Sequence, residues 1–328
     1  MSLSTIFTVS TFQSALETGC IYALVALALF ISFSILNIAD LTTDGCYTLG
    51  CAVGAMVTLS GHPFLAVPAA MLAGAAAGFV TAFLQTKLGV ESILAGIIVN
   101  TGLYTINLLV MKSSVVNIFN CDTIFRYAKS ASGGNWYKVI VVVSIVLIVV
   151  LLLTWFLNTR LGLSIRATGD NSSMVRASSI NPAFTITVGL CVANSLTGLA
   201  GCLLVQYQNS VDINIGTGMV TIALASLIIG ETLFGKGGIL KRTAGVVIGS
   251  CLYRIIVAIA IRMHMPAESL KLVSAIIVAA AIAIPYLKKR AGFFKNRLVQ
   301  MRQKNAVKKQ TRQAERQIKA QSGEGGDR

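Results

Sequence analysis

Residues 158–182 read NTRLGLSIRATGDNSSMVRASSINP and form the one long polar passage between blocks of sequence that have the composition of membrane helices. Within it, the side-chain oxygen of Asp170 can accept hydrogen bonds from the free backbone N–H groups of a following turn, which predicts a short helix over residues 171–178. Met174 and Val175 stand there among arginines and hydroxyl groups, a mixed surface that suits a groove on a soluble protein at the membrane face. The other interpretation is an ordinary cytoplasmic loop with a capped turn.

The composition excludes an ordinary soluble domain. Hydrophobic residues make up 55% of the 328 positions, charged residues only 12%, and the mean hydropathy is +0.77. Apolar runs of roughly 20 residues, the length that crosses a bilayer as an α-helix, recur along the chain. The sequence therefore predicts an all-α polytopic membrane protein.

The net charge of +15 resides mostly in a C-terminal tail, because residues 288–328 hold 13 Lys and Arg against 3 Asp and Glu. Nucleic-acid binding would need this charge beside a folded reading element with aromatic side chains, whereas a membrane protein places Lys and Arg on its cytoplasmic side. We expect no nucleic-acid partner. The tail either only fixes the cytoplasmic orientation of the last helix or also binds anionic membrane lipids.

About nine membrane segments follow from the hydrophobic blocks, with one of them broken or re-entrant. If the tail is cytoplasmic, counting back places the basic groups of Lys236–Arg242, Arg160–Arg176 and Lys87 inside and the N-terminus outside. The expected organisation is a transmembrane domain over 1–287 and a basic cytoplasmic tail over 288–328. The segments cover residues 15–38, 52–59, 64–85, 93–111, 139–157, 183–206, 217–234, 244–261 and 270–287.

The break falls in NIADLTTDGCYTLG, residues 37–50, where Asp40 and Asp44 interrupt the hydrophobic sequence. A carboxylate this close to hydrocarbon must be paired, hydrated in a cavity or placed at the water edge. Irregular backbone at membrane depth needs protein or a watery cavity around it. Both residues are therefore candidates for the substrate path, and a plain cytoplasmic turn is the alternative.

A polar face is expected on the segment 93–111. Asn100, Tyr104 and Asn107, with Thr101 beside them, recur at spacings of three and four and so share one side of a helix. We expect this face to point into the bundle. It either lines a translocation path or only joins helices by hydrogen bonds.

Small residues recur at intervals of four in the segment 64–85, at Ala70, Gly74 and Gly78. Such a stripe lets two helices approach closely in a membrane. We expect a tightly packed helix pair there.

No pattern for catalysis, a metal or a cofactor is evident. The chain has two histidines and no C-x-x-C among its seven cysteines, and GETLFGKGGILKR, residues 230–242, lacks the spacing of a phosphate-binding loop. We expect neither an enzyme nor a bound cofactor. Arg254 is either paired within the bundle, with Glu231 as the candidate partner, or extended toward a membrane face.

Four stretches together carry a resemblance to a known family. They are LNIADLTTDGCYTLGCAVGA (36–55), ESILAGIIVNTGLYTINLLVM (91–111), LGLSIRATGDNSSMVRASSINP (161–182) and GETLFGKGGILKRTAGVVIGS (230–250). In this order they resemble the permease subunits of bacterial ABC importers of the branched-chain amino acid and ribose type, and the second is similar to the subgroup associated with tryptophan or other aromatic amino acids. Ser179 departs from the family pattern, which has Gly there, and the extra N-terminal helix of the sugar-type members is absent.

The resemblance implies an ABC importer permease fold in a bacterial plasma membrane. It implies that the third stretch is a coupling loop that docks on a separate ATPase subunit. A dimer of permeases would work with two ATPases inside and a substrate-binding protein outside, and would move a small solute inward, such as an amino acid of the tryptophan kind. The coupling residues implied are Gly169, Asp170, Asn171, Met174 and Arg176.

One other class of protein remains open at this point. An ion-coupled secondary transporter would use Asp40, Asp44 or Glu231 to couple uptake to protons or sodium. The two classes differ in their energy source.

Overall fold

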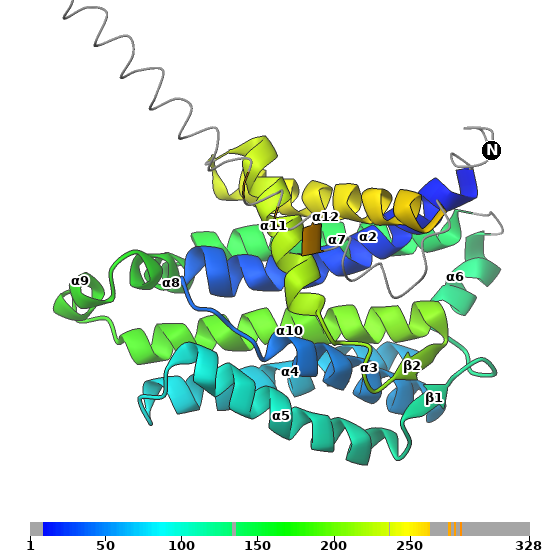
Figure 1. Ribbon diagram of the computed structural model, residues 1–328, viewed down its shortest axis with the longest axis horizontal. Helices are drawn as coiled ribbons and strands as arrows, with labels where there is room; N and C mark the ends of the chain where they lie inside the picture. Colours follow the sequence, from blue (N-terminus) through cyan, green and yellow to red (C-terminus); the bar gives the residue numbers. More distant parts are fainter. Residues whose placement is uncertain are drawn as a thin grey trace, which may run out of the picture. The chain divides into compact units, whose positions relative to one another are not determined.

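A computed structural model describes residues 9–132, 136–235 and 237–262, together with the isolated positions 275, 276, 279 and 283 (Figure 1). The chain divides into two units, Met1–Val278 and Ala279–Arg328. The description below concerns the first unit. The ninth expected segment, 270–287, and the basic tail lie outside the continuously described ranges.

The described chain is almost entirely helical. Its helices are α2 (Val9–Leu29), the π-helix η1 (Phe30–Ile35), α3 (Thr43–Leu59), α4 (Pro63–Thr86), α5 (Ser92–Met111), α6 (Ile124–Ser132), α7 (Tyr137–Asn158), α8 (Arg160–Asp170), α9 (Ser172–Ala177), α10 (Pro182–Gln208), α11 (Met219–Phe234) and α12 (Ile239–Arg262). Two three-residue strands, β1 (Val115–Asn117) and β2 (Ser210–Asp212), pair antiparallel with Val116 opposite Val211.

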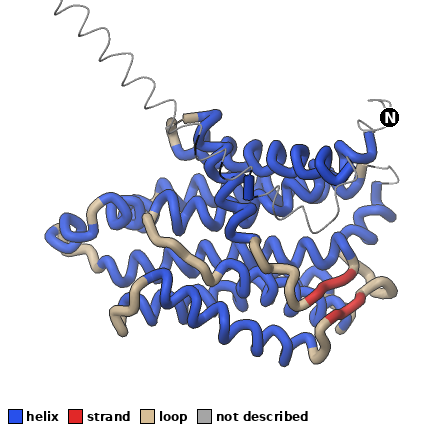
Figure 2. Tube along the Cα trace, viewed as in Figure 1, coloured by secondary structure: helices blue, strands red, loops and turns tan. Residues whose placement is uncertain are grey.

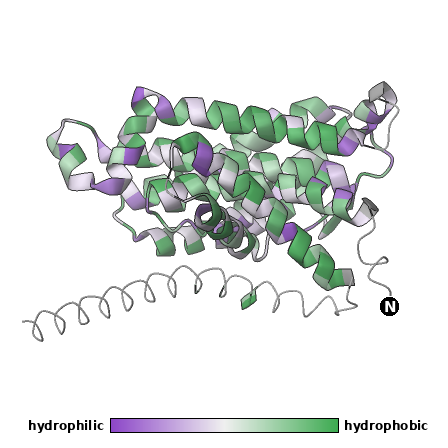
Figure 3. Ribbon diagram, turned by 90° about the horizontal axis from the view of Figure 1, so that it is seen from above, coloured by the Kyte–Doolittle hydropathy of each residue, from purple (hydrophilic) through white to green (hydrophobic). Residues whose placement is uncertain are grey.

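Six of these helical spans are long and apolar enough to cross a membrane: α2 with η1, α4, α5, α7, α10 and α12. The helices α3 and α11 are shorter, with 17 and 16 residues. Eight of the nine expected segments thus correspond to helices of the structure, which confirms the prediction of an all-α polytopic membrane protein. Figure 3 shows apolar residues along the helices and hydrophilic ones gathered mostly near the helix ends and in connections.

Two helices form the centre of the first unit. In the most apolar 18-residue stretch of α2 and of α10, 78% is buried, against 28–39% in the other four long helices. In Figure 1, α10 passes between α2 and α4, and it contacts both. The remaining long helices cover this pair and present large apolar side chains outward.

The pairing of α4 with α10 depends on glycine. A side chain at Gly74 would meet the Asn194 carbonyl, and one at Gly78 would meet the Leu190 carbonyl 2.5 Å away. On the facing helix, a side chain at Gly198 would meet the carbonyl of Ala70. This confirms the close approach predicted from Ala70, Gly74 and Gly78.

The predicted break is present. The helical backbone ends with η1 at Ile35 and resumes at Thr43, and between them Asn37 adopts a left-handed conformation with φ of 57°. A second irregular segment, residues 213–218, leads from β2 to α11. Figure 2 shows both segments running through the helical bundle, so α3 and α11 each begin within it.

Candidate functional site

The polar passage 158–182 folds into two short helices at one end of the bundle, α8 and α9 (Figure 1). Thr159 caps α8 by accepting from the Gly162 N–H at 3.3 Å. Asn171 caps α9, because its Oδ1 accepts from the N–H groups of Ser173 and Met174, both at 3.1 Å. The short helix was predicted correctly, but the assignment of its cap to Asp170 was wrong.

Asp170 cannot cap α9 because it is the last residue of α8, and the chain changes direction only at Asn171, whose φ and ψ are −158° and 98°. Gly169 likewise lies inside α8 and not at the turn. An amide oxygen caps a helix as well as a carboxylate does. The sequence therefore offered two adjacent cap candidates that propensity does not separate.

The coupling residues implied by the resemblance divide into two environments. Asp170, Asn171, Met174 and Arg176 are exposed, and the Met174 side chain is 68% exposed. Gly169 instead faces the bundle, where a side chain would meet the carbonyl oxygen of Ile35, the last residue of η1. The exposed part of α8–α9 is therefore in backbone contact with the start of the broken segment.

Asp40 lies in the broken segment and is 3% exposed. Its carboxylate accepts from the Thr42 N–H at 2.9 Å and from the Asn194 side-chain amide of α10 at 2.8 Å. The neighbouring hydroxyl of Thr42 bonds to that of Thr81 on α4 at 2.9 Å. These bonds attach the irregular backbone to two helices, α10 and α4.

Asp44 connects the two helices that begin inside the bundle. It lies in the first turn of α3, and its carboxylate accepts from the N–H groups of Gly218 and Val220 at 3.0 and 2.8 Å, at the start of α11. The N-terminal end of a helix stabilises negative charge because its N–H groups are unpaired. This carboxylate therefore fastens α11 to α3.

The four polar residues of α5 do not share one environment. Asn107 is buried and donates to the Gly45 carbonyl of α3 at 3.1 Å, and Asn100 is half-buried against the same Gly45. Thr101 and Tyr104 are exposed within the single chain. The expectation that the whole face points into the bundle was correct for the two asparagines and wrong for Thr101 and Tyr104, because α5 contacts the bundle along a narrower stripe.

Arg242 and Arg254 of α12 have different partners, and the one found for Arg254 is not the expected Glu231. Arg242 forms the ion pair with Glu231, at 2.7 Å, and also donates to the Ser34 hydroxyl. Arg254 donates to the Thr18 hydroxyl at 3.2 Å, so its pairing with Glu231 was wrong. Glu231 at the end of α11 thus pairs with Arg242 in the first turn of α12.

Within the described ranges, no three His, Cys, Asp or Glu side chains lie close enough together to hold a metal ion. The carboxylates of Asp40 and Asp44 instead accept hydrogen bonds that hold the irregular segments before α3 and before α11.

The sequence from 12 to 282 matches the family described as "Branched-chain amino acid transport system / permease component". This match covers most of the chain and includes the two irregular segments, 36–42 and 213–218, and the α8–α9 region. The chain belongs to this permease family.

Relatives of this permease include both amino acid and sugar systems. It is 34% identical to the "Tyrosine transport system permease protein" of Clostridioides difficile over 271 residues, which cover 82% of this chain and 90% of the relative. It is 31% identical to the D-allose transport system permease protein of Escherichia coli, over 64% of this chain and 65% of that one. Its identity to the ribose import permease of Escherichia coli is 26%, over 74% and 76%. No solved structure matches the chain.

Membership confirms the resemblance read from the four motifs. The chain is a multi-pass membrane permease of the ABC type, and the family is one of transport subunits and not of enzymes.

Proposed function

We propose that this permease is the membrane-spanning subunit of an importer that moves an amino acid inward, driven by ATP hydrolysis in a separate subunit. The observation that carries the proposal is the α8–α9 unit, which exposes a capped helix at one end of the bundle and contacts the broken segment through Gly169 and Ile35. Such a unit could transmit a conformational change from a soluble partner to the membrane helices.

The contact with the ATPase would use the exposed residues of α8–α9. Met174 supplies a large apolar side chain, and Arg176 a charge at the last turn of α9. The buried Val175 anchors the helix from below, since it is 4% exposed. An exposed apolar anchor with polar neighbours is the usual form of a helix that enters a groove on another protein. Asp170 and Asn171 complete this surface.

The substrate path would run beside the two irregular segments. Asp40 and Asp44 hold their backbone, and Asn100 and Asn107 line α5 where it meets α3. Thr101 and Tyr104 would face a second copy of the permease, so that the path lies between two subunits. The exposed phenol of Tyr104 is better satisfied against such a partner than against lipid, where it would lack a hydrogen bond, whereas the Thr101 hydroxyl already donates to the Ile97 carbonyl.

The orientation proposed places α8–α9, Lys87 and the basic tail in the cytoplasm of a bacterial cell and the N-terminus outside the plasma membrane. A substrate-binding protein would then deliver the solute at the end opposite α8–α9. The 13 Lys and Arg of 288–328 would lie near anionic lipids of the inner surface.

An aromatic amino acid such as tyrosine or tryptophan is the proposed solute. The relative named for tyrosine transport matches this chain at higher identity and over more of both chains than the allose and ribose permeases do. A tyrosine permease and a sugar permease share the fold, so the choice of solute depends on side chains along the path.

One observation favours an ion-coupled secondary transporter as the second candidate. Asp40 is buried, and the ion pairs among the described residues, Arg126–Asp122 and Arg242–Glu231, do not include it. A buried carboxylate without a cation can serve a proton or sodium ion. Asp44 and Glu231 fit this role less well, because their charges are already engaged by α11 and by Arg242.

The experiment that decides between the two is uptake into proteoliposomes that hold the permease with the ATPase from its own operon and the matching binding protein. We expect uptake of a labelled aromatic amino acid that requires internal ATP and persists when a protonophore or sodium ionophore is added. Uptake without ATP that collapses with an ionophore would replace the importer by the ion-coupled transporter.

The coupling surface is tested separately by replacing Asp170 and Arg176 with Ala. We expect the ATPase to be lost on purification while the permease level in the membrane stays normal. The matched control removes Asp122 and Arg126, an exposed acid–base pair of the same composition outside α8–α9. Equal retention of the ATPase by both double variants would contradict the assignment.

A further inference from the structure

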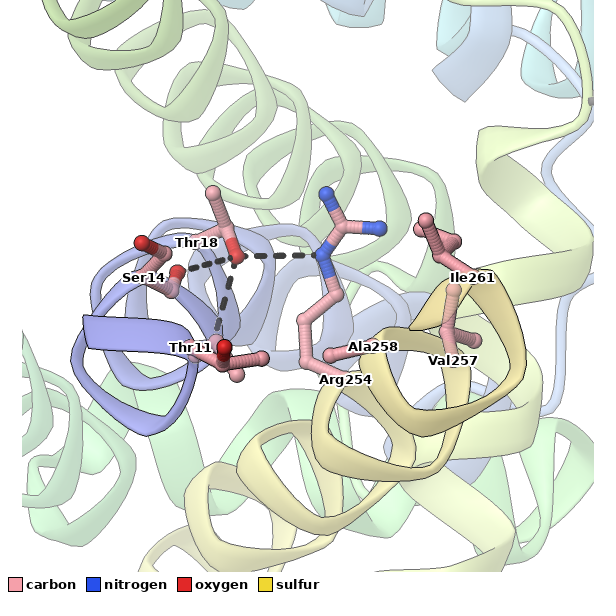
Figure 4. A pocket seen from close by; sticks show the side chains of 8 residues that line it. Thr11, Ser14, Thr18, Arg254, Val257, Ala258 and Ile261 are labelled. Atoms are coloured by element: carbon pink, nitrogen blue, oxygen red, sulfur yellow. Dashed lines mark hydrogen bonds between the residues drawn. The ribbon is translucent and has the colours of Figure 1, made fainter. Parts of the chain in front are cut away.

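A cavity of about 320 Å³ lies between α2 and α12 (Figure 4), near the first residues of α2, at the end of that helix opposite α8–α9 in Figure 1. One wall carries the hydroxyl groups of Thr11, Ser14 and Thr18, which follow one face of α2. The facing wall is α12, with Arg254 and beyond it apolar side chains such as Val257 and Ile261. The cavity is thus polar on one side and apolar on the other.

Arg254 is held firmly at this cavity. Its guanidinium lies 4.5 Å from the centre of the Tyr22 ring, and its Nε donates to the Thr18 hydroxyl at 3.2 Å. The helices approach closely beneath it, because the Ser250 hydroxyl donates to the Gly19 carbonyl at 2.8 Å and a side chain at Gly19 would touch the Cα of Cys251. The guanidinium is therefore positioned by stacking and one hydrogen bond.

The positive charge of Arg254 has no balancing carboxylate in the described part of the chain. The ion pairs there belong to Arg126 and Arg242, and the nearby Glu17 accepts from the Tyr207 hydroxyl at 2.8 Å and from Gln13 at 3.0 Å. The two terminal nitrogens of Arg254 make no hydrogen bond to a described residue. A guanidinium is rarely left in this state at membrane depth, because its desolvation is unfavourable without a partner.

A second unsatisfied group faces the same cavity. The hydroxyl oxygen of Thr11 is buried and has no hydrogen-bond partner among the described residues. Buried hydroxyl groups are normally paired, and each orphan calls for an explanation. The terminal N–H groups of Arg254 and the Thr11 hydroxyl can therefore donate to a further molecule in the cavity.

We propose that this cavity binds an oxyanion, with the terminal N–H groups of Arg254 paired to two of its oxygens and the Thr11 hydroxyl donating to it. The planar fork of a guanidinium matches carboxylate and phosphate groups in this manner. The oxyanion can come from the phosphate of a lipid headgroup, whose acyl chains would follow the apolar wall of α12, or from a dissolved carboxylate or phosphate. The site is independent of the import function proposed above.

Native mass spectrometry of the purified permease tests the lipid source. Full-length protein in detergent is titrated with phosphatidylglycerol and, separately, with phosphatidylcholine, whose zwitterionic headgroup has no net charge. We expect phosphatidylglycerol to bind with at least about tenfold higher affinity, the usual scale of hydrogen bonds to a charged group. Arg254→Gln should lower the affinity for phosphatidylglycerol severalfold, and Arg126→Gln, which removes the same charge from an exposed pair, should leave it unchanged.

Thermal unfolding of the same samples tests the dissolved source. Inorganic phosphate and acetate are compared with chloride at equal ionic strength. Stabilisation by phosphate or acetate that disappears in Arg254→Gln, with no lipid preference, assigns the site to a dissolved oxyanion. If Arg254→Gln does not fold, Arg254→Lys and Thr11→Val replace it, since each keeps the charge and should weaken binding severalfold. The absence of any Arg254-dependent or Thr11-dependent preference in both experiments would overturn the proposal.

Discussion

The neighbouring helices α4 and α5 are both long, apolar and mostly unburied, yet they meet their surroundings differently. The buried face of α4 consists mostly of Ala and Gly, and backbone touches backbone where it crosses α10. In α5 the buried stripe packs on α3, while the polar residues Thr101 and Tyr104 are exposed. Overall apolarity therefore does not reveal where a membrane helix finds its partner. Small residues indicate a partner within the chain, and exposed polar groups indicate one outside it.

The strongest test of this contrast inserts the same side chain into both helices. Gly74→Val places two methyl groups against the Asn194 carbonyl, and we expect a loss of stability of roughly 3 kcal/mol because α4 and α10 must separate. Gly102→Val on α5 is the matched control, since nothing lies within 4 Å of its added Cβ, and it should change stability by less than about 0.5 kcal/mol. Thermal unfolding of both variants in the same detergent measures the difference. Comparable losses would show that the α4–α10 contact is looser than described.

A smaller effect separates the two sides of α5 itself. Asn107→Leu removes the hydrogen bond to the Gly45 carbonyl at nearly constant volume, and we expect a loss of roughly 1 kcal/mol. Thr101→Val removes a hydroxyl that bonds only to the Ile97 carbonyl of its own helix, and should leave stability within about 0.5 kcal/mol. Its effect should appear instead in the self-association of the permease. Equal destabilisation by both would mean that Thr101 is buried in the purified state.

The smallest effect on the whole molecule is expected at α9, whose exposed face resembles the outer face of α5 in lacking a partner within the described chain. Asn171→Ala removes the cap of a six-residue helix and should cost about 1 kcal/mol of local stability. Hydrogen exchange should accelerate over 172–177 while α10 is unaffected. Ser178→Ala, which alters one exposed hydroxyl beyond the helix, is the control. Unchanged exchange in Asn171→Ala would show that Val175 alone holds α9.

Features that depend on local spacing could be predicted from the sequence. The small-residue stripe of α4, the break around Asp40 and Asp44 and the short helix after residue 170 all follow from residues within one or two turns of each other. The sequence also indicated the family from the order of four motifs. Partners chosen by the fold could not be predicted in the same way.

Glu231 pairs with Arg242 and not with Arg254, and this choice depends on the geometry of the connection between α11 and α12. The exposure of Thr101 and Tyr104 depends on which helix packs against α5, and helical periodicity does not predict the neighbouring helix. The role of Asp44 at the start of α11 could have been suspected, because a carboxylate near hydrocarbon needs donors and a helix start supplies them. No spacing rule links positions 44 and 218 along the chain.

The contact between Gly169 and the Ile35 carbonyl also has a mechanical meaning. Side chains between two moving parts can change rotamer and absorb a displacement, whereas two backbones in direct contact cannot. A push on α8 would therefore reach the end of η1 at almost full amplitude, and would arrive five residues before Asp40. In the proposed importer, the absent side chain of this one glycine would make the joint stiff, and α8 would act on η1 like a rigid lever.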